Sequence, residues 1–139
     1  MVEKLIKIAV VAMVTGFIMW VIGGLWHNLV MPLINVNAEA HHEGLVLMLV
    51  SYFMLSIFMV LLFLMYRQKN DNAFAGLKAG VFIGIVWVFP HGLALAGAHG
   101  GSIAYEFRNT AYHIFEQGLG GLTIYYCYKL IDKIFLRKA

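Results

Sequence analysis

Charge is scarce in this chain. Of its 139 residues only 12% are charged, whereas 62% are hydrophobic. A soluble domain carries about 25% charged and about 45–50% apolar residues, so this composition excludes a soluble globular domain, a disordered chain and a coiled coil. The formal net charge of +3 is too small a surplus to indicate a nucleic-acid partner.

Cysteine is nearly absent, and common catalytic motifs are missing. Cys127 is the single cysteine, which excludes an intramolecular disulfide and a cysteine-rich zinc cluster. A bound metal ion would therefore depend on histidine and carboxylate ligands. The sequence has no Gly-x-Ser-x-Gly motif, Walker loop or dinucleotide fingerprint. We therefore do not expect this chain to catalyse a reaction on its own.

Long uncharged runs dominate the sequence instead. Residues 8–38, 44–66 and 79–105 contain no Asp, Glu, Lys or Arg. Each run exceeds the roughly 20 residues that an α-helix needs to cross the hydrocarbon core of a bilayer. These three segments are therefore predicted to be transmembrane helices.

A fourth apolar segment is interrupted by polar residues. It covers about residues 106–129 and contains Arg108, His113 and Glu116, so a helix here requires shielding by the other helices. The turns between the segments are short, which favours antiparallel neighbours. We predict an all-α integral membrane four-helix bundle, a single domain over residues 1–139, with helices at about 5–31, 43–66, 74–96 and 105–130.

The positions of the cations predict the orientation in the membrane. Nine of the ten lysines and arginines fall on one side of the predicted helices, and Arg108 alone falls on the other. The positive-inside rule then places both termini in the cytoplasm. We expect a multi-pass protein of the plasma (inner) membrane, with the lipid bilayer as a partner. The nine cations are Lys4, Lys7, Arg67, Lys69, Lys78, Lys129, Lys133, Arg137 and Lys138.

The first and third predicted helices resemble each other. Gly16 and His27 have the same separation as Gly80 and His91, and each histidine is followed by leucine two residues later. The match predicts a duplicated helical hairpin. The third helix also has a glycine every fourth residue from position 76 to position 84. Such a stripe favours close packing of two helices, with room for a flat ligand as the alternative.

Polar residues of the fourth helix repeat at helical spacing. Glu106, Asn109, His113, Glu116 and Gly120 alternate by three and four residues, which places them on one helix face. Exposing such a stripe to hydrocarbon costs several kcal/mol, so we expect it to face the interior. All six histidines and four of the seven acidic residues fall in the predicted outer half of the molecule.

Two cofactor sites are compatible with these histidines. His27 and His91 are candidate axial ligands of a b-type haem, with glycines nearby that leave room for the porphyrin. His113 and Glu116, with His42 or His91, are candidate ligands of zinc, copper or iron. The alternatives are a structural hydrogen bond for His91, an anchor in the interfacial aromatic belt for His27, and a solvated helix cap for His42.

Three functions fit these features. The first is a small accessory or structural subunit of a larger membrane complex, or of a homo-oligomer, with a His- and Glu-rich site on the extracytoplasmic side. The second is a haem b or transition-metal protein that transfers electrons or handles metal. The third is a small transporter or channel subunit. A visible spectrum and a metal analysis would separate the second function from the other two.

Overall fold

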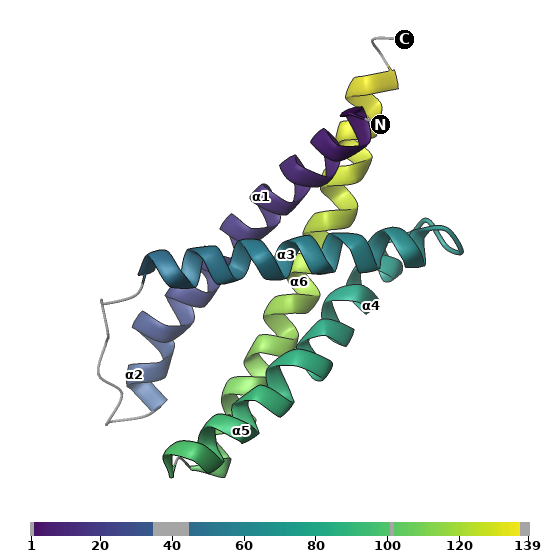
Figure 1. Cartoon of the computed structure of the whole chain (residues 1–139). Helices are drawn as coiled ribbons and strands as arrows, with labels where there is room; N and C mark the ends of the chain where they lie inside the picture. The colour runs from purple at the N-terminus through teal and green to yellow at the C-terminus, as the bar shows by residue number, and fades with distance from the viewer. Residues whose placement is uncertain (1, 35–44, 101, 137–139) are drawn as a thin grey trace.

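The computed structural model describes residues 2–34, 45–100 and 102–136, and every regular element in this part of the chain is helical (Figure 1). The all-α prediction is confirmed for these residues. The elements, with η marking a π-helical turn, are α1 (Val2–Leu25), η1 (Trp26–Val30), α2 (Met31–Ile34), α3 (Leu45–Arg67), α4 (Ala73–Ile83), η2 (Gly84–Val88), α5 (Phe89–His99) and α6 (Ile103–Leu136).

These elements form four helical rods, because α1, η1 and α2 follow one another without a break, as do α4, η2 and α5. The spans Val2–Leu33, Val46–Arg67 and Ala73–Ala98 are long and apolar enough to cross a membrane. The described part of the fourth rod, α6, does not meet this measure, because polar side chains such as Asn109, His113 and Glu116 lower its hydropathy.

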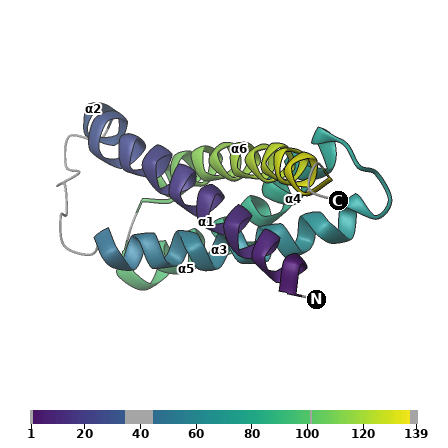
Figure 2. The ribbon, with the colours of Figure 1, turned by 90° about the horizontal axis from the view of Figure 1, so that it is seen from above.

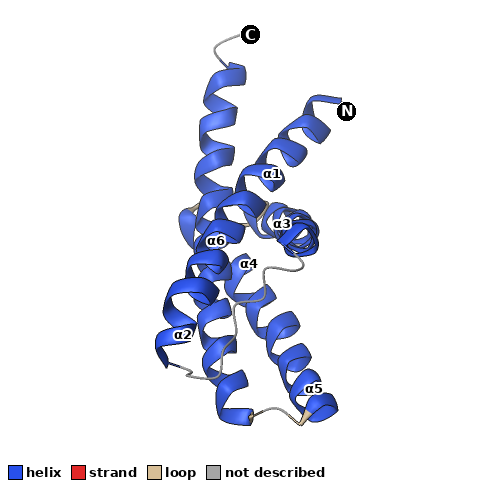
Figure 3. Cartoon of the chain, turned by 90° about the vertical axis from the view of Figure 1, so that its left-hand side faces the viewer, coloured by secondary structure: helices blue, strands red, loops and turns tan. Residues whose placement is uncertain are grey.

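The polar helix α6 is shielded by the other rods. It contacts α1, α3, α4, η2 and α5. The rod formed by α4 and α5 runs alongside α6 (Figure 1). Helix α3 crosses the other rods steeply, so the view of Figure 3 looks down the axis of α3 while the other rods lie lengthwise. Viewed from above, α1 runs obliquely between α3 and α6 (Figure 2). One face of the centre of α6, including Glu116 and Gln117, is thereby buried, whereas Phe115 on the other side is 63% exposed.

Glycines allow α4 and α6 to approach closely. A Cβ atom on Gly80 would collide with the backbone carbonyl of Gln117, and Cβ atoms on Gly76 and Gly121 would each collide with the other residue's carbonyl oxygen. A Cβ on Gly84 would lie 2.8 Å from the Cα of Ile114. The predicted close packing is confirmed, and the backbone of α6 occupies the space beside this stripe.

Both π-helical turns end two residues before a proline, Pro32 for η1 and Pro90 for η2. Proline lacks an N–H donor, and its ring collides with the carbonyl four residues earlier. A π-helical turn avoids this collision by shifting hydrogen bonds to the fifth residue back. In η1, the N–H of Met31 donates to the carbonyl of Trp26, five residues earlier.

Ion pairs hold three rods together where α1 begins and where α3 and α6 end, a region called the basic end below. Asp132 accepts hydrogen bonds from Lys7 at 3.1 Å and from Arg67 at 2.8 Å. Arg67 also pairs with Asp71 in the α3–α4 turn at 3.0 Å, and Lys129 pairs with Asp71 at 3.2 Å. Two carboxylates thus join α1, α3, α6 and this turn.

Replacing Gly80 with alanine should separate α4 from α6. We expect Gly80→Ala to lower the free energy of unfolding by about 1–3 kcal/mol, because the added methyl group overpacks the contact with Gln117. Gly24→Ala is the matched control, since a Cβ at Gly24 meets nothing within 4 Å. The control should stabilise the helix by about 0.5–1 kcal/mol. Unfolding in mixed micelles, followed by tryptophan fluorescence, measures both changes, and equal effects would contradict the close-contact interpretation.

The basic end should lose stability in acid. Burial raises the pKa of Asp132, but hydrogen bonds from Arg67 and Lys7 and the charges of both bring it below its usual 3.8. Hydrogen bonds and charges from Lys129 and Arg67 likewise overcome burial and lower the pKa of Asp71. A carboxylate with a lowered folded-state pKa stabilises the fold above its unfolded pKa, and this stabilisation is lost as the pH falls through the folded value.

We therefore expect the melting temperature to fall steeply below about pH 4. Asp132→Asn should flatten this part of the curve. Glu3→Gln is the control, because the Glu3 side chain is 57% exposed and its pairing with Lys7 is screened by solvent. An unchanged pH profile for Asp132→Asn would contradict this assignment.

Candidate functional site

A fully enclosed carboxyl group marks the centre of the molecule. Glu116 of α6 has no exposed surface, and Gln117 beside it is 1% exposed. The side chain of His113 is 15% exposed. The inward orientation predicted for the polar stripe of α6 is therefore confirmed at Glu116 and His113. An enclosed carboxyl group of this kind requires hydrogen-bond donors, because burial without them is costly.

Three hydrogen-bonding side chains surround Glu116. The hydroxyl of Tyr52, on α3, donates to Oε1 at 2.9 Å, and the hydroxyl of Tyr112 donates to the same oxygen at 3.5 Å. Nδ1 of His113 lies 2.7 Å from Oε2. His113 and Tyr112 are three and four residues before Glu116 on the same helix, the spacing at which side chains meet. Tyr52 adds a link between α3 and α6.

The backbone of α1 closes the third side of this group. A Cβ atom on Gly23 would lie 2.8 Å from Oε1 of Glu116 and would collide with the Tyr52 hydroxyl. Only glycine at this position leaves room for both oxygens. The Glu116 carboxyl therefore lies where α1, α3 and α6 meet.

The π-helical turn η1 adds two rings next to this carboxyl. Trp26 stacks on Tyr112 with 4.0 Å between ring centroids and 3° between planes. The ring of His27 lies 5.7 Å from that of His113. We call Trp26, His27, Tyr52, Tyr112, His113 and Glu116 together the Glu116 cluster.

The predicted cofactor ligands are only partly brought together. His113 and Glu116 are in direct contact, and His27 lies beside His113. His91 is exposed and stacks on Trp87, one turn earlier in its own rod, at 6.1 Å between centroids. Its neighbour Gly92 faces Glu106 of α6 instead. His42 lies outside the described residues.

The haem prediction needs free space beside the glycines, and the metal prediction needs several ligands close together. Gly80 and Gly84 lie against the backbone of α6, and Gly16 and Gly23 lie against side chains of α3. The space beside these glycines is therefore filled by neighbouring helices. Among the described residues, no group of three or more His, Cys, Asp or Glu side chains is placed to hold a metal ion. The haem and metal assignments remain predictions.

Several polar atoms around the Glu116 cluster have unused hydrogen-bonding capacity. Nε1 of Trp26, Oδ1 of Asn109, Oγ1 of Thr110 and Oε1 of Gln117 are buried and have no hydrogen-bond partner among the described residues. Buried polar atoms of this kind are commonly satisfied by ordered water or by a ligand.

The sequence analysis missed two residues that contact Glu116. Tyr112 is four residues before Glu116, so the helical spacing that selected His113 also contains a signal for it. Tyr52 lies 64 residues away in the sequence, on another helix. No local pattern identifies it, because its position depends on how α3 crosses α6.

Removing the buried carboxyl should weaken the fold. We expect Glu116→Ala to lower the free energy of unfolding by about 3–5 kcal/mol, because it leaves His113 and the Tyr52 hydroxyl without their partner. Tyr52→Phe removes a single donor and should cost about 1–3 kcal/mol. Tyr126→Phe is its matched control, since Tyr126 is 62% exposed, and should stay within about 0.5 kcal/mol of the parent protein.

The same variants test whether the contact is direct. In a double-mutant cycle, Tyr52→Phe and Glu116→Gln should couple by about 0.5–3 kcal/mol, whereas Tyr126→Phe and Glu116→Gln should be additive. Unfolding in mixed micelles measures all of these variants. Unaltered stability of Glu116→Ala would show that the cluster does not hold the helices together.

Comparison with known proteins adds no family to this description. No protein-family model matches the chain, and no curated protein or solved structure matches it. Since no relative supplies a function, the function proposed below is inferred from the residues of this chain.

Proposed function

We propose that this protein is an accessory subunit of a larger membrane complex. It crosses the plasma membrane with α6 as a fourth, shielded helix of the predicted bundle, and both termini lie in the cytoplasm. The partner covers the outer half of the rod formed by α4, η2 and α5. Three apolar spans and nine cations on one side of the predicted helices support the membrane part of this proposal.

The hydrogen bonds of the Glu116 cluster lie within this chain, which supports a structural role. Its carboxyl group accepts hydrogen bonds from Tyr52 and Tyr112 and is hydrogen-bonded to His113, which are all side chains of the same chain. A carboxyl group bonded in this way links α3 to α6, and Gly23 lets α1 pack against it. The cluster then serves as the rigid centre on which an external surface is presented.

The exposed stack of Trp87 and His91 is the observation that carries the partner assignment. Trp87 is 62% exposed and His91 is also exposed, yet both lie within the span Ala73–Ala98. At 1.5 Å per residue they lie roughly 2 Å and 8 Å from the middle of that span. The hydrocarbon extends about 15 Å from its middle, so this imidazole lies at hydrocarbon depth.

Hydrocarbon is an unfavourable environment for this pair. An imidazole exposed to lipid tails lacks hydrogen bonds, and polar side chains within membranes usually face other helices or a wet cavity. Tryptophan prefers the membrane–water interface to the bilayer middle. A partner helix that offers a hydrogen-bonding side chain to His91 would satisfy both residues. Just 28% of the most apolar part of each span is buried within the chain, which leaves surface for such a helix.

The haem, metal and transporter assignments stay predictions beside this proposal. The contact between His113 and Glu116 supplies one imidazole and one carboxylate for the metal hypothesis, and among the described residues no third such ligand is placed with them. A Soret band would indicate haem, and stoichiometric zinc, copper or iron would indicate a metal site. The purified protein used below serves both measurements.

Site-specific photocrosslinking tests the partner assignment. A photoreactive amino acid in place of Trp87 should give one discrete adduct in native membranes, because the partner helix covers this position. Phe58 of α3 is the matched control position. It is 58% exposed, and the residues three and four positions away on its helix are apolar, so a partner would have no polar side chain to satisfy there. The mass of the adduct then distinguishes a second copy of this chain from a different subunit.

His91→Leu should reduce the crosslink at position 87 about tenfold, which corresponds to loss of about 1.4 kcal/mol of association free energy. Crosslinking at positions 58 and 87 with the same low yield, together with extraction of a uniform single-copy particle, would overturn the proposal.

A further inference from the structure

A cavity of about 370 Å³ opens at the basic end, between the start of α1 and the ends of α3 and α6. Its volume lies within the range of about 300–1,000 Å³ that is typical of small-ligand pockets. Leu64 provides an apolar wall, and the other lining residues are polar. They are Glu3, Lys4 and Lys7 of α1, Arg67 of α3, and Tyr128 and Asp132 of α6.

Cations exceed carboxylates in this lining. Lys4, Lys7 and Arg67 face two carboxylates, Glu3 and Asp132, so the lining has one positive charge in excess. Asp132 lies between Lys7 and Arg67 and fixes their positions, at 3.1 Å and 2.8 Å. Lys4 takes part in no ion pair among the described residues, and it is the cation whose charge remains available.

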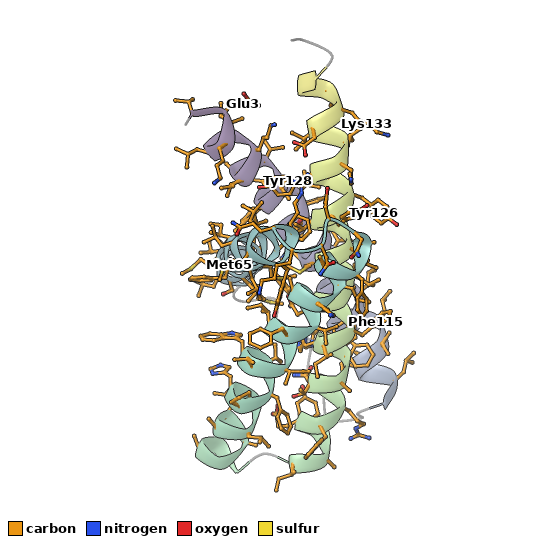
Figure 4. All side chains as sticks on the ribbon, turned by 90° about the vertical axis from the view of Figure 1, so that its right-hand side faces the viewer. Glu3, Met65, Phe115, Tyr126, Tyr128 and Lys133 are labelled. Atoms are coloured by element: carbon orange, nitrogen blue, oxygen red, sulfur yellow. The ribbon has the colours of Figure 1, made fainter. Side chains whose placement is uncertain are left out.

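Tyr128 adds an unused donor. The residue is 4% exposed, and its hydroxyl has no hydrogen-bond partner among the described residues. The guanidinium carbon of Arg67 lies 5.5 Å from the centre of its ring. Figure 4 labels Tyr128 and Lys133 on α6 and Glu3 on α1, with Tyr128 at the level where the two helices come together. A buried phenol in this position is suited to donate to an anion oxygen.

We propose that this cavity binds a phosphate group through Lys4, Arg67 and Tyr128. Phosphate has several acceptor oxygens, and Lys and Arg are its usual ligands in proteins. The carboxylates of Glu3 and Asp132 leave one net positive charge, which favours a singly charged phosphate group such as a phosphodiester or dihydrogen phosphate. This site is separate from the partner surface at Trp87.

The position of the cavity favours the headgroup of a phospholipid as the source of this phosphate. The cavity lies at the ends of two apolar spans, Val2–Leu33 and Val46–Arg67. Headgroups lie immediately outside the hydrocarbon, so a headgroup reaches the cavity while its acyl chains follow the exposed apolar faces of the spans. Free phosphate has the same recognition chemistry, and the experiment distinguishes the two sources.

Ligand titration of the purified full chain tests the proposal. The delipidated protein in neutral detergent is titrated with short-chain phosphatidylglycerol, with diacylglycerol as a lipid lacking phosphate, and with inorganic phosphate against chloride at equal ionic strength. Tryptophan fluorescence and thermal stability give the dissociation constant. We expect phosphatidylglycerol to bind and diacylglycerol not to bind.

Two variants and two matched controls locate the site. Lys4→Gln should weaken phosphatidylglycerol binding about fivefold, the effect of one cation at a membrane surface. Tyr128→Phe should weaken it about tenfold through loss of one charge-assisted hydrogen bond. Lys69→Gln and Tyr126→Phe remove the same groups from exposed positions outside the cavity and should leave binding unchanged. Circular dichroism and gel filtration confirm that each variant is folded.

The possible outcomes separate the sources and the alternatives. Phosphatidylglycerol binding that inorganic phosphate does not displace identifies the lipid headgroup, and displacement by inorganic phosphate identifies free phosphate. Either result supports a phosphate site if it depends on Lys4 and Tyr128. Equal losses for Lys4→Gln and Lys69→Gln would indicate general surface attraction and overturn the proposal. Equal binding of diacylglycerol, or no binding of any phosphate compound, would also overturn it.

Discussion

A carboxyl group enclosed by apolar helices is stable only where hydrogen-bond donors reach it. In this protein the requirement is met by residues from two helices, and a glycine on a third gives the carboxyl room. Moving α3 away from α6 would separate Glu116 from the Tyr52 hydroxyl, and Gly23 lets α1 pack directly against the same two side chains. The relative positions of α1, α3 and α6 are therefore coupled through one side chain. This coupling explains how a chain with few charges fixes one arrangement among several apolar ones.

The contact between α4 and α6 depends on a different constraint. Lipid tails are as apolar as leucine, so apolar burial alone gives membrane helices little reason to associate. Close packing of backbones provides the attraction instead, and Gly76, Gly80 and Gly121 permit it. The polar cluster and the glycine contact occupy different faces of α6. One helix thus organises both halves of the fold, although it is the least apolar of the four rods.

The sequence predicted the rods better than their arrangement. Hydropathy and breaker residues determine where a helix begins and ends, so the bounds of α3 and of the rod from α4 to α5 lie close to those predicted. Helical spacing likewise identified the inward face at Glu116. The steep crossing of α3, and with it the position of Tyr52, depends on contacts between residues far apart in the sequence.

The orientation of His91 is another feature that the sequence did not predict correctly. Its match with His27 predicts equivalent positions, but Gly84 and Gly92 face α6. One residue corresponds to about 100° of rotation on a helix, so His91 turns away from α6. In an uninterrupted α-helix, His91 would share the face of Gly84, because it lies seven residues later. The π-helical turn η2 between them shifts the phase, and neither the glycine stripe nor the histidine match accounts for that turn.

The two π-helical turns have a consequence for how this molecule can vary. Each has the geometry of one extra residue inserted into an α-helix, which turns every side chain beyond it by about 100° relative to the helix before it. Gain or loss of a single codon upstream of Pro32 or Pro90 would therefore change which side chains two rods present at the ends away from the basic end. In η1 such a change moves Trp26 and His27 together, while the sequence after the turn stays the same. The half of this protein away from the basic end can therefore diverge through chain length as well as through exchange of residues.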